Sequence, residues 1–351
     1  MARYVRLESG DVVSSTTKVT SGYFTGGVGA LGGSNLTTSS LGTSEKKYYY
    51  NLQYSSEDQF SVTYGHKGGS GSDNVTNVVG ETEAVYRQYA NMLLSPDEVS
   101  DSTTDGAFKF DGTNVDNDIY VLVGERARYK DRINKKNWTL HLSGSLSSSV
   151  PTALSLTDDS ETVTATATRV GPRYNVVEGT AGTVTTPAST TNYGYFYPNV
   201  GVIVLNANQL SASIPGNVAS LLSGSTEGVS QLVHGLAPDL RNTGAADNAF
   251  KFFLAVNKGA DTSFRSEEDQ LSTSFFCRAK ATEFNYSNNP TFTSGSEGEL
   301  AVASYKGNPQ SFITTVGLYN DNQELLAVGK LSSPVQKNYS TEATIKVTLT
   351  F

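Results

Sequence analysis

Few side chains in this sequence combine the types and the spacing that nucleophilic catalysis requires. Cys277 is the sole cysteine, and it follows Phe275 and Phe276 in an apolar run, so we expect a buried and unreactive thiol. The three histidines are scattered along the chain, and no GxSxG motif supplies a nucleophile beside a base. The sequence therefore predicts a protein that is not an enzyme.

One acidic stretch resembles a calcium loop. Asn114, Asp116 and Asp118 alternate within the run 111–118, as oxygen ligands do in such loops. The EF-hand pattern requires glycine at the next position, which is Ile119 here. We expect an exposed acidic turn in front of a strand, and the sequence predicts no metal or other cofactor.

Two further acidic groups and one tyrosine cluster could serve a saccharide. Asp158 and Asp159 are neighbours, as are the residues of the run 267–269, so a strand would point adjacent carboxylates apart and solvated loops explain both groups. Carboxylate catalysis on a sugar needs two groups at a defined separation. Tyr193, Tyr195 and Tyr197 could form an aromatic platform for a glycan, although packing in a core or an interface suits a tyrosine-rich β-protein better.

A basic cluster stands out because the chain as a whole is acidic. The 26 Lys and Arg residues against 34 Asp and Glu residues give a net charge of −8, which argues against nucleic acid as a partner. Arg126, Arg128, Lys130 and Arg132 would share one face of a strand. Two interpretations remain open: a contact with an acidic neighbouring subunit, and a solvated face.

The composition indicates a mainly β-protein. Of the 351 residues only 17% are charged and 10% are aromatic, with 33 glycines and many serines and threonines, which excludes a coiled coil or a helical bundle. No signal peptide and no apolar run long enough for a membrane span is visible, so we expect a protein made inside a cell and no membrane partner.

The pattern of apolar residues predicts antiparallel sandwich or sheet domains with one or a few short helices and extended Gly/Ser/Thr-rich arms. We divide the chain into an extended arm (1–45), a β-rich domain (46–143) with a helix over 81–94, a polar β excursion (144–192) and a second β-rich domain (193–351). The expected strands include the runs 4–7, 119–123, 138–142, 200–205, 250–256 and 272–280, and short helical turns are expected near 218–222 and 229–234.

The carboxyl-terminal residues show the clearest pattern. Two apolar runs, 311–319 and 324–331, flank a turn-forming Asn-Asp-Asn sequence and predict a hairpin. Alternation of apolar and polar residues from Ala343 to Phe351 predicts a final strand with one buried face. Candidate assembly contacts from this region are Val316, Leu318, Tyr319, Leu325, Leu326, Ile345, Val347, Leu349 and Phe351, together with the basic cluster.

This hairpin resembles a recurrent element of phage tail proteins. The stretch from Phe312 to Val328 contains "VGLYN" and "LLAV" runs, and it is followed by Pro334, Lys337 and the final alternating strand. It resembles carboxyl-terminal or attachment domains of baseplate wedge components and tail fibres. Segments 79–94, 118–142 and 283–290 resemble virion structural proteins of contractile-tailed cyanophages.

The resemblance implies a virion protein of a contractile tail, made in the host cytoplasm. It would be a wedge or peripheral component of the baseplate, with other tail subunits and further copies of this chain as its partners. It supplies no catalytic residues. Alternatives left open are a tail-fibre adaptor, a head decoration protein, a receptor-binding protein that recognises host surface glycans, and a polysaccharide-degrading enzyme.

Overall fold

The computed structural model describes residues 4–23, 35–39, 49–70, 72, 80–101, 105–144, 153–210, 213–214, 248–259, 262–287 and 289–351. The chain divides into two compact units. The small unit comprises Met1–Lys18 and Asp269–Phe351, and the large unit comprises Val19–Glu268. The chain passes between them within two strands, β1 (Val12–Tyr23) and β14 (Arg265–Ala279).

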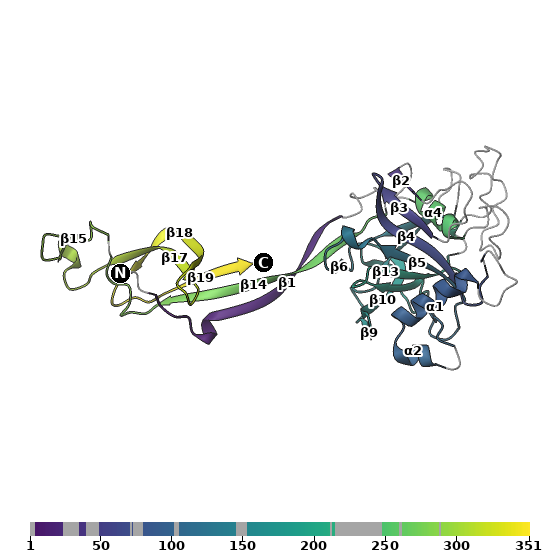
Figure 1. Ribbon diagram of the computed structural model, residues 1–351, viewed down its shortest axis with the longest axis horizontal. Coiled ribbons are helices and arrows are strands. Elements are labelled where there is room, and N and C mark those ends of the chain that lie inside the picture. Colours follow the sequence, from purple (N-terminus) through teal and green to yellow (C-terminus); the bar gives the residue numbers. More distant parts are fainter. Residues whose placement is uncertain are drawn as a thin grey trace. The chain divides into compact units, whose positions relative to one another are not determined.

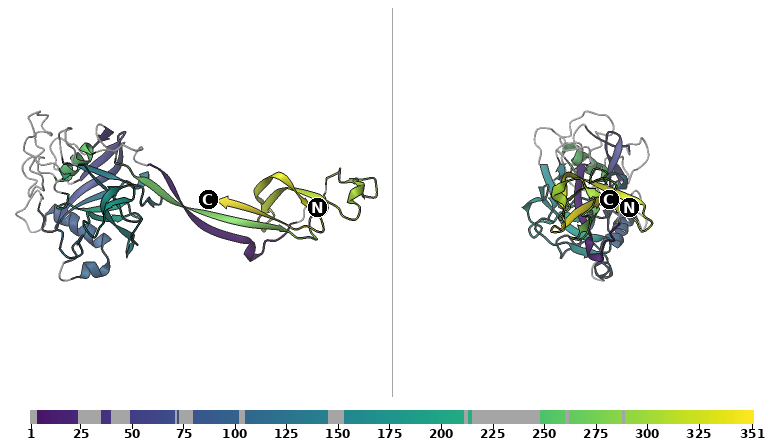
Figure 2. Two further views of the ribbon diagram at one scale, coloured as in Figure 1. Left: turned by 180° about the vertical axis from the view of Figure 1, so that it is seen from behind. Right: turned by 90° about the vertical axis from the view of Figure 1, so that its left-hand side faces the viewer.

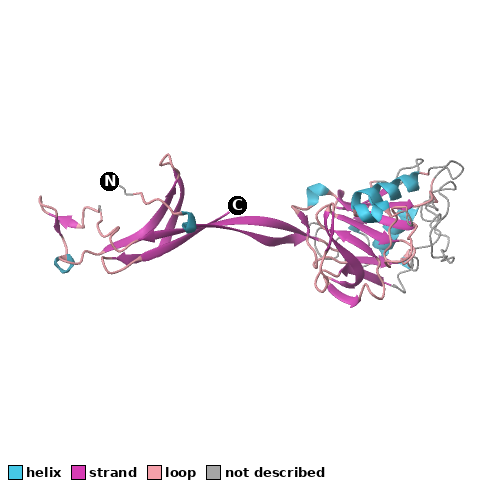
Figure 3. Ribbon diagram, turned by 90° about the horizontal axis from the view of Figure 1, so that it is seen from below, coloured by secondary structure: helices cyan, strands magenta, loops and turns pink. Residues whose placement is uncertain are grey.

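Strands make up 47% of the structure and helices 15%, which confirms the mainly β prediction. Strands dominate both units, and the longer helices α1 (Glu81–Leu93) and α4 (Asn248–Lys258) belong to the large unit (Figure 3). The remaining strands of the large unit are β2 (Leu36–Thr37), β3 (Tyr49–Tyr54), β4 (Glu57–His66), β5 (Asp118–Gly124), β6 (Arg132–Ile133), β7 (Leu140–Ser143), β8 (Ala153–Asp158), β9 (Thr166–Thr168), β10 (Gly171–Thr180), β11 (Thr183–Thr186), β12 (Gly194–Tyr197) and β13 (Val202–Asn206).

An 11-stranded antiparallel sheet organises the large unit. Its main path runs β2-β3-β4-β5-β13-β12-β10-β8-β7, and β9 and β11 pair with β10 at its side. The central strands β4, β5 and β13 lie side by side in Figure 1, and Figure 2 gives two further views. The predicted strands at 119–123, 138–142 and 200–205 correspond to β5, β7 and β13.

Two hydrophobic cores cover opposite faces of this sheet. Along β5, Tyr120 and Leu122 point into one core, whereas Ile119 and Val121 point into the other, and all four are fully buried. Helix α1 packs on the second face against β4, where Gly65 allows close approach: a Cβ there would lie 3.0 Å from the backbone nitrogen of Tyr86. Helix α4 contacts β3, β4 and β7 on the first face.

Helix α4 corrects the prediction of a strand at 250–256. Its residues from Asn248 to Val256 are all buried, so apolar side chains occur on every side and no helical stripe is visible in the sequence. A short apolar run of this kind fits a buried strand and a buried helix equally well. The helical turns expected at 218–222 and 229–234 lie outside the described residues.

Residues 153–186 also differ from expectation, because they do not form a polar excursion. Strands β8 and β10 are inner members of the large sheet, and Leu156, Val176 and Val177 are completely buried. The prediction failed because most residues of this segment are polar, so the few aliphatic residues that face the core did not stand out in the sequence.

The small unit has two sheet fragments of its own. Besides these, β14 pairs with β1 on one side and with β19 (Ala343–Thr350) on the other, in the order β1-β14-β19. Strands β17 (Ser311–Tyr319) and β18 (Leu325–Lys337) form the predicted hairpin, and β15 (Thr293–Ser294) pairs with β16 (Glu299–Leu300). The face of β19 with Ile345, Val347 and Leu349 is half-buried rather than fully buried as predicted.

The small unit also contains a fully buried lysine. Lys337, at the end of β18, donates from Nζ to the carbonyl oxygen of Ala281 (3.1 Å), Oδ1 of Asn285 (2.8 Å) and the carbonyl oxygen of Asn338 (2.8 Å). Burial lowers the pKa of this ammonium. Three carbonyl acceptors satisfy its three donors, so Lys337 joins the segment after β14 to the segment before β19.

Candidate protein-interaction surface

The acidic pair Asp158–Asp159 is buried, which contradicts the expectation of a solvated loop. Oδ2 of Asp158 accepts from the backbone nitrogen of Lys136 at 2.8 Å, and Oδ1 accepts from that of Ser160 at 3.0 Å. Asp159 accepts from both the backbone nitrogen (3.0 Å) and Nδ2 (2.7 Å) of Asn175. Burial raises the pKa of the Asp158 carboxyl. Both carboxyls satisfy backbone donors between β8 and its neighbours, which is a structural role.

Glu267 of the second acidic run is buried too, so solvated loops do not explain this run either. It lies in β14 opposite Arg132 of β6, and Oε2 accepts a hydrogen bond of 2.8 Å from Nδ2 of Asn134. Burial therefore differs along this acidic run: Glu267 is buried, Glu268 is half-buried and Asp269 is exposed.

The calcium-like loop closes on itself. Asp111 accepts from the backbone nitrogens of Thr113 (2.8 Å) and Asn114 (2.7 Å), and these bonds hold the pKa of its carboxyl below the usual range. Asp116 accepts from the backbone nitrogen of Phe110 at 2.8 Å and from Nδ2 of Asn206 at 2.7 Å. Across the described part of the chain, no three His, Cys, Asp or Glu side chains gather in a way that could hold a metal ion.

The basic cluster is not on one face of a strand. Arg126 and Arg128 lie in a 3-10 turn, η3 (Arg126–Arg128), and β6 begins only at Arg132. Because these residues do not form one continuous strand, their side chains do not alternate between two faces as the sequence analysis expected.

Each member of the basic cluster has a partner within the large unit. Arg126 donates to the carbonyl oxygen of Tyr129 at 2.6 Å, and Arg128 pairs with Glu57 at 2.6 Å. Ion pairs also join Lys130 to Glu268 and Arg132 to Glu267, the latter at 3.5 Å. These contacts tie the loop after β5 to β4 and β14.

The three tyrosines do not form one platform, because Tyr193 is half-buried against the first core of the large unit, whereas Tyr195 and Tyr197 belong to the second core. Tyr195 and Tyr197 are 8% and 1% exposed, and the Tyr195 hydroxyl donates to the carbonyl oxygen of Lys109 at 2.8 Å. The Arg173 guanidinium lies 4.2 Å from the centre of the Tyr195 ring. Burial raises the pKa of Tyr195 to about 12. These rings support the sheet and offer no open face to a sugar.

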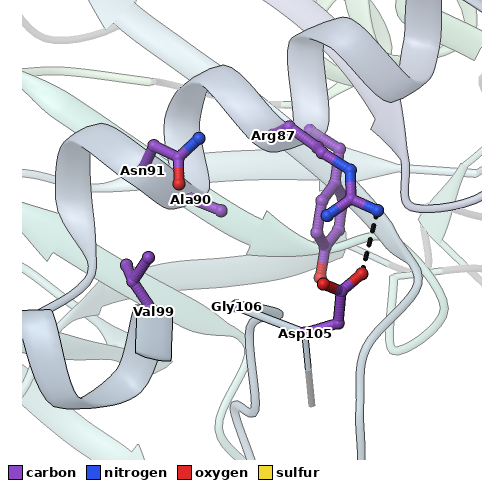
Figure 4. Close-up of a pocket in the computed structure, with 7 residues that line it drawn as sticks. Arg87, Ala90, Asn91, Val99, Asp105 and Gly106 are labelled. Carbon is purple, nitrogen blue, oxygen red and sulfur yellow. Dashed lines mark hydrogen bonds and ion pairs between the residues drawn. The ribbon is translucent and has the colours of Figure 1, made fainter. Parts of the chain in front are cut away.

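A small hollow opens beside helix α1 (Figure 4). It has a volume of about 110 Å³ and is lined by Tyr86, Arg87, Ala90, Asn91, Val99, Asp105 and Gly106. Arg87 bridges Glu83 (3.0 Å) and Asp105 (2.9 Å), and the Tyr86 hydroxyl donates to the carbonyl oxygen of Asp116 at 2.6 Å. Ligand sites usually enclose roughly 300–1,000 Å³, so this hollow is too small to serve as one.

The small unit exposes many large apolar side chains that packing within the chain does not cover. The described part of the chain has 18 exposed large apolar side chains, and 15 of them belong to this unit. By contrast, Ala279, Phe292 and Leu318 are the only apolar residues of the small unit among the buried side chains of the described residues. Large exposed apolar patches on soluble proteins mark interaction sites.

The predicted contacts on the hairpin fall into two groups. Tyr319, Leu325, Leu326 and Phe351 are exposed, at 44%, 52%, 66% and 72%. Val316, Leu318, Ile345, Val347 and Leu349 are half-buried or buried between the hairpin and β19, where a Cβ on Gly329 would lie 3.8 Å from Val347. The structure thus separates packed residues of the hairpin and β19 from exposed ones, which are Tyr319, Leu325 and Leu326 on the hairpin and Phe351 after β19.

The sequence did not identify Tyr4 as part of this surface. Its ring meets the ring of Tyr319 edge-on, with 4.9 Å between the centroids. The expected strand at 4–7 does not form, and the first strand of the chain begins at Val12. A long-range contact of this kind has no local signal in the sequence.

Comparison with protein-family models, with curated proteins and with solved structures gives no match. No helix among the described residues has both the length and the apolar character needed to cross a membrane.

Proposed function

We propose that this protein is a non-enzymatic structural component of a contractile phage tail, a wedge or peripheral protein of the baseplate, which acts by protein–protein contacts. The observation that carries the proposal is the contrast between the well-packed large unit and the small unit, whose apolar side chains lie mostly on its surface. A module that leaves its apolar residues exposed gains stability when neighbouring subunits cover them.

Two further features support this proposal. The small unit contains the hairpin and final strand that resemble phage tail attachment elements, here β17, β18 and β19. Its charges balance, with nine basic against nine acidic residues, so the net charge of −8 belongs to the large unit. A neutral surface does not repel neighbouring proteins, whereas net charge opposes association.

The experiment is complementation of a phage that lacks the encoding gene. A chain that ends at Glu342 lacks β19, which uncovers the inner face of the hairpin, and we expect it to be absent from purified particles. The control is Val163→Ser, which alters an exposed apolar residue of the large unit and should leave incorporation unchanged. Normal incorporation of the shortened chain would contradict the proposal.

A second measurement keeps the test independent of folding. Immunogold labelling of the full-length protein should mark the distal end of the tail. Labelling at the head would support a decoration protein instead, and labelling along a fibre would support an adaptor. The full-length chain is used here, so an unfolded variant cannot produce either result.

The glycan-binding alternative receives no support from the residues that suggested it. Tyr195 and Tyr197 are core residues, and Asp158 and Asp159 accept backbone hydrogen bonds. The proposal therefore concerns protein partners alone.

A further inference from the structure

We infer that the outer face of the β17–β18 hairpin is a self-complementary docking surface that binds a second copy of this chain. We define the outer patch as Tyr319, Leu325, Leu326, Val328 and the neighbouring Tyr4. The inference rests on the proposed function, because it names a partner for the surface on which that function depends.

The outer patch is formed by the geometry of the hairpin. Gly317 pairs with Val328, and Tyr319 pairs with Leu325, so these residues share one face of the hairpin. Gly317 has no side chain, and a Cβ there would come within 2.8 Å of the Tyr319 ring and 3.3 Å of Cδ1 of Leu325. The two large side chains therefore lie across the strand and extend the apolar face.

The opposite face of the hairpin is already occupied. Leu318 is 8% exposed, and Gly329 lies next to Val347 of β19. Leu318 pairs with Ala327 and Tyr319 pairs with Leu325, so the register shifts there and Leu326 has no partner residue on β17. Leu326 is 66% exposed, the most exposed member of the outer patch. Covering the outer patch would give the hairpin apolar contacts on both faces.

The distribution of charge along the hairpin favours a second copy as the partner. Lys330 pairs opposite Thr315, two residues from Val328, so an exposed basic group borders one end of the outer patch. Asp321 and Glu324 are exposed in the turn at the other end. When two hairpins meet in antiparallel orientation, each Lys330 comes opposite the acidic turn of the other copy, and the apolar centres coincide.

The size of the outer patch agrees with this arrangement. Five half-exposed apolar side chains offer on the order of 100 Å² each, since a fully buried aromatic side chain covers roughly 150–250 Å². Two copies would then bury about 1,000 Å² in total, close to the lower limit for a specific interface. We therefore expect a dimer with a dissociation constant in the micromolar range.

The test is sedimentation equilibrium of the full chain over concentrations from about 1 to about 100 μM, a range that brackets micromolar affinity. The wild-type chain should shift from monomer to dimer and stop there. Val328→Lys places charge in the outer patch and should weaken the dimer at least about tenfold. The matched control, Val163→Lys on the large unit, should not change the equilibrium.

A charge exchange tests the antiparallel arrangement. Lys330→Glu and Asp321→Lys should each weaken the dimer, and the double variant should restore it, because the opposite charges then meet again in exchanged positions. Asp321 is chosen because the hydrogen bonds between Asn320 and Glu324 hold the turn without it.

Three outcomes would overturn the inference: a monomeric wild-type chain at every concentration, a dimer that Val328→Lys leaves intact, or single charge variants that the double variant does not rescue. Circular dichroism of each variant confirms that it is folded. The proposed function fails separately: a chain that dimerises but never enters particles contradicts the tail role, whereas a monomeric chain that enters particles contradicts only self-docking.

Discussion

The two units of this protein stabilise their strands in different ways. The large unit has a sheet covered on both faces, so β5 contributes Tyr120 and Leu122 to one core and Ile119 and Val121 to the other. The small unit has paired strands with one half-buried layer, and most of its large apolar side chains face outward. Isolated two-stranded hairpins are marginally stable in water. This difference is the basis of our proposal that the small unit gains stability from a partner, whereas the large unit covers both faces of its sheet itself.

The largest effect that separates the units should come from their aromatic side chains. Phe252 of α4 is fully buried and lies 4.8 Å from the Tyr120 ring, so Phe252→Ala should lower the free energy of unfolding of the large unit by about 3–5 kcal/mol. Trp138 is the only tryptophan and is buried in the same core, so its fluorescence reports this unfolding.

The matched variant for this comparison is Phe312→Ala in the small unit. Phe312 is 53% exposed, and its loss should change the unfolding free energy, followed by circular dichroism, by no more than about 0.5 kcal/mol. Equal losses from the two variants would mean that the small unit has a core of its own, contrary to the comparison.

The second prediction concerns Lys337, a fully buried cation of the small unit. Lys337→Met keeps the length of the side chain but leaves three carbonyl acceptors without their donor, at a cost of about 2–3 kcal/mol. Hydrogen exchange of the amides in β18 and β19 should accelerate, while exchange in β5 and β13 stays unchanged. Lys330→Met, at an exposed position of the same strand, is the control and should have no such effect in dilute solution.

The third prediction uses pH to examine the large unit. Burial raises the pKa of the Asp158 carboxyl in the folded chain above its unfolded value. The unfolded chain then releases its proton first as pH increases, so the Asp158 contribution to stability falls between the unfolded and the folded pKa. The urea concentration at the midpoint of unfolding of the wild-type chain should therefore decrease as the pH rises through this interval.

Asp158→Asn removes the titrating group and should remove that part of the pH dependence. It should also cost about 1–3 kcal/mol, because both carboxyl oxygens accept backbone hydrogen bonds and an amide nitrogen cannot replace either of them. An unchanged pH profile would show that Asp158 is not the source of the decrease.

The sequence predicted elements well where local patterns decide them. The helix expected over 81–94 is found as α1, and the hairpin with its Asn-Asp-Asn turn is found as β17 and β18. A continuous apolar run located β5, and alternation of apolar and polar residues located β7 and β19. Periodicity is a local property, so a single sequence contains the information.

The sequence failed where tertiary packing decides the outcome. The run 250–256 is a helix packed on the face of the large sheet formed by β3, β4 and β7, which its apolar composition alone does not indicate. Asp158 is buried where the backbone nitrogen of Lys136, which is distant in the sequence, donates to its carboxylate. Likewise, the ion pair between Arg128 and Glu57 and the ring contact between Tyr4 and Tyr319 join residues that are far apart in the sequence. The hairpin was a predicted contact site, but only the structure separates its packed face from its open one.

The smallest expected effect is also the one that distinguishes exposure from instability. Leu326 is 66% exposed, so Leu326→Ser should change the unfolding free energy of the dilute protein by no more than about 0.5 kcal/mol. The same change should reduce binding of a hydrophobic dye, because it removes an apolar side chain from the outer patch. Val163→Ser, the corresponding change on the large unit, should reduce dye binding less, since only three large apolar side chains are exposed in the described part of that unit. If Leu326→Ser instead lowered stability by several kcal/mol in dilute solution, the hairpin would already be packed within a single chain, and the small unit would need no partner.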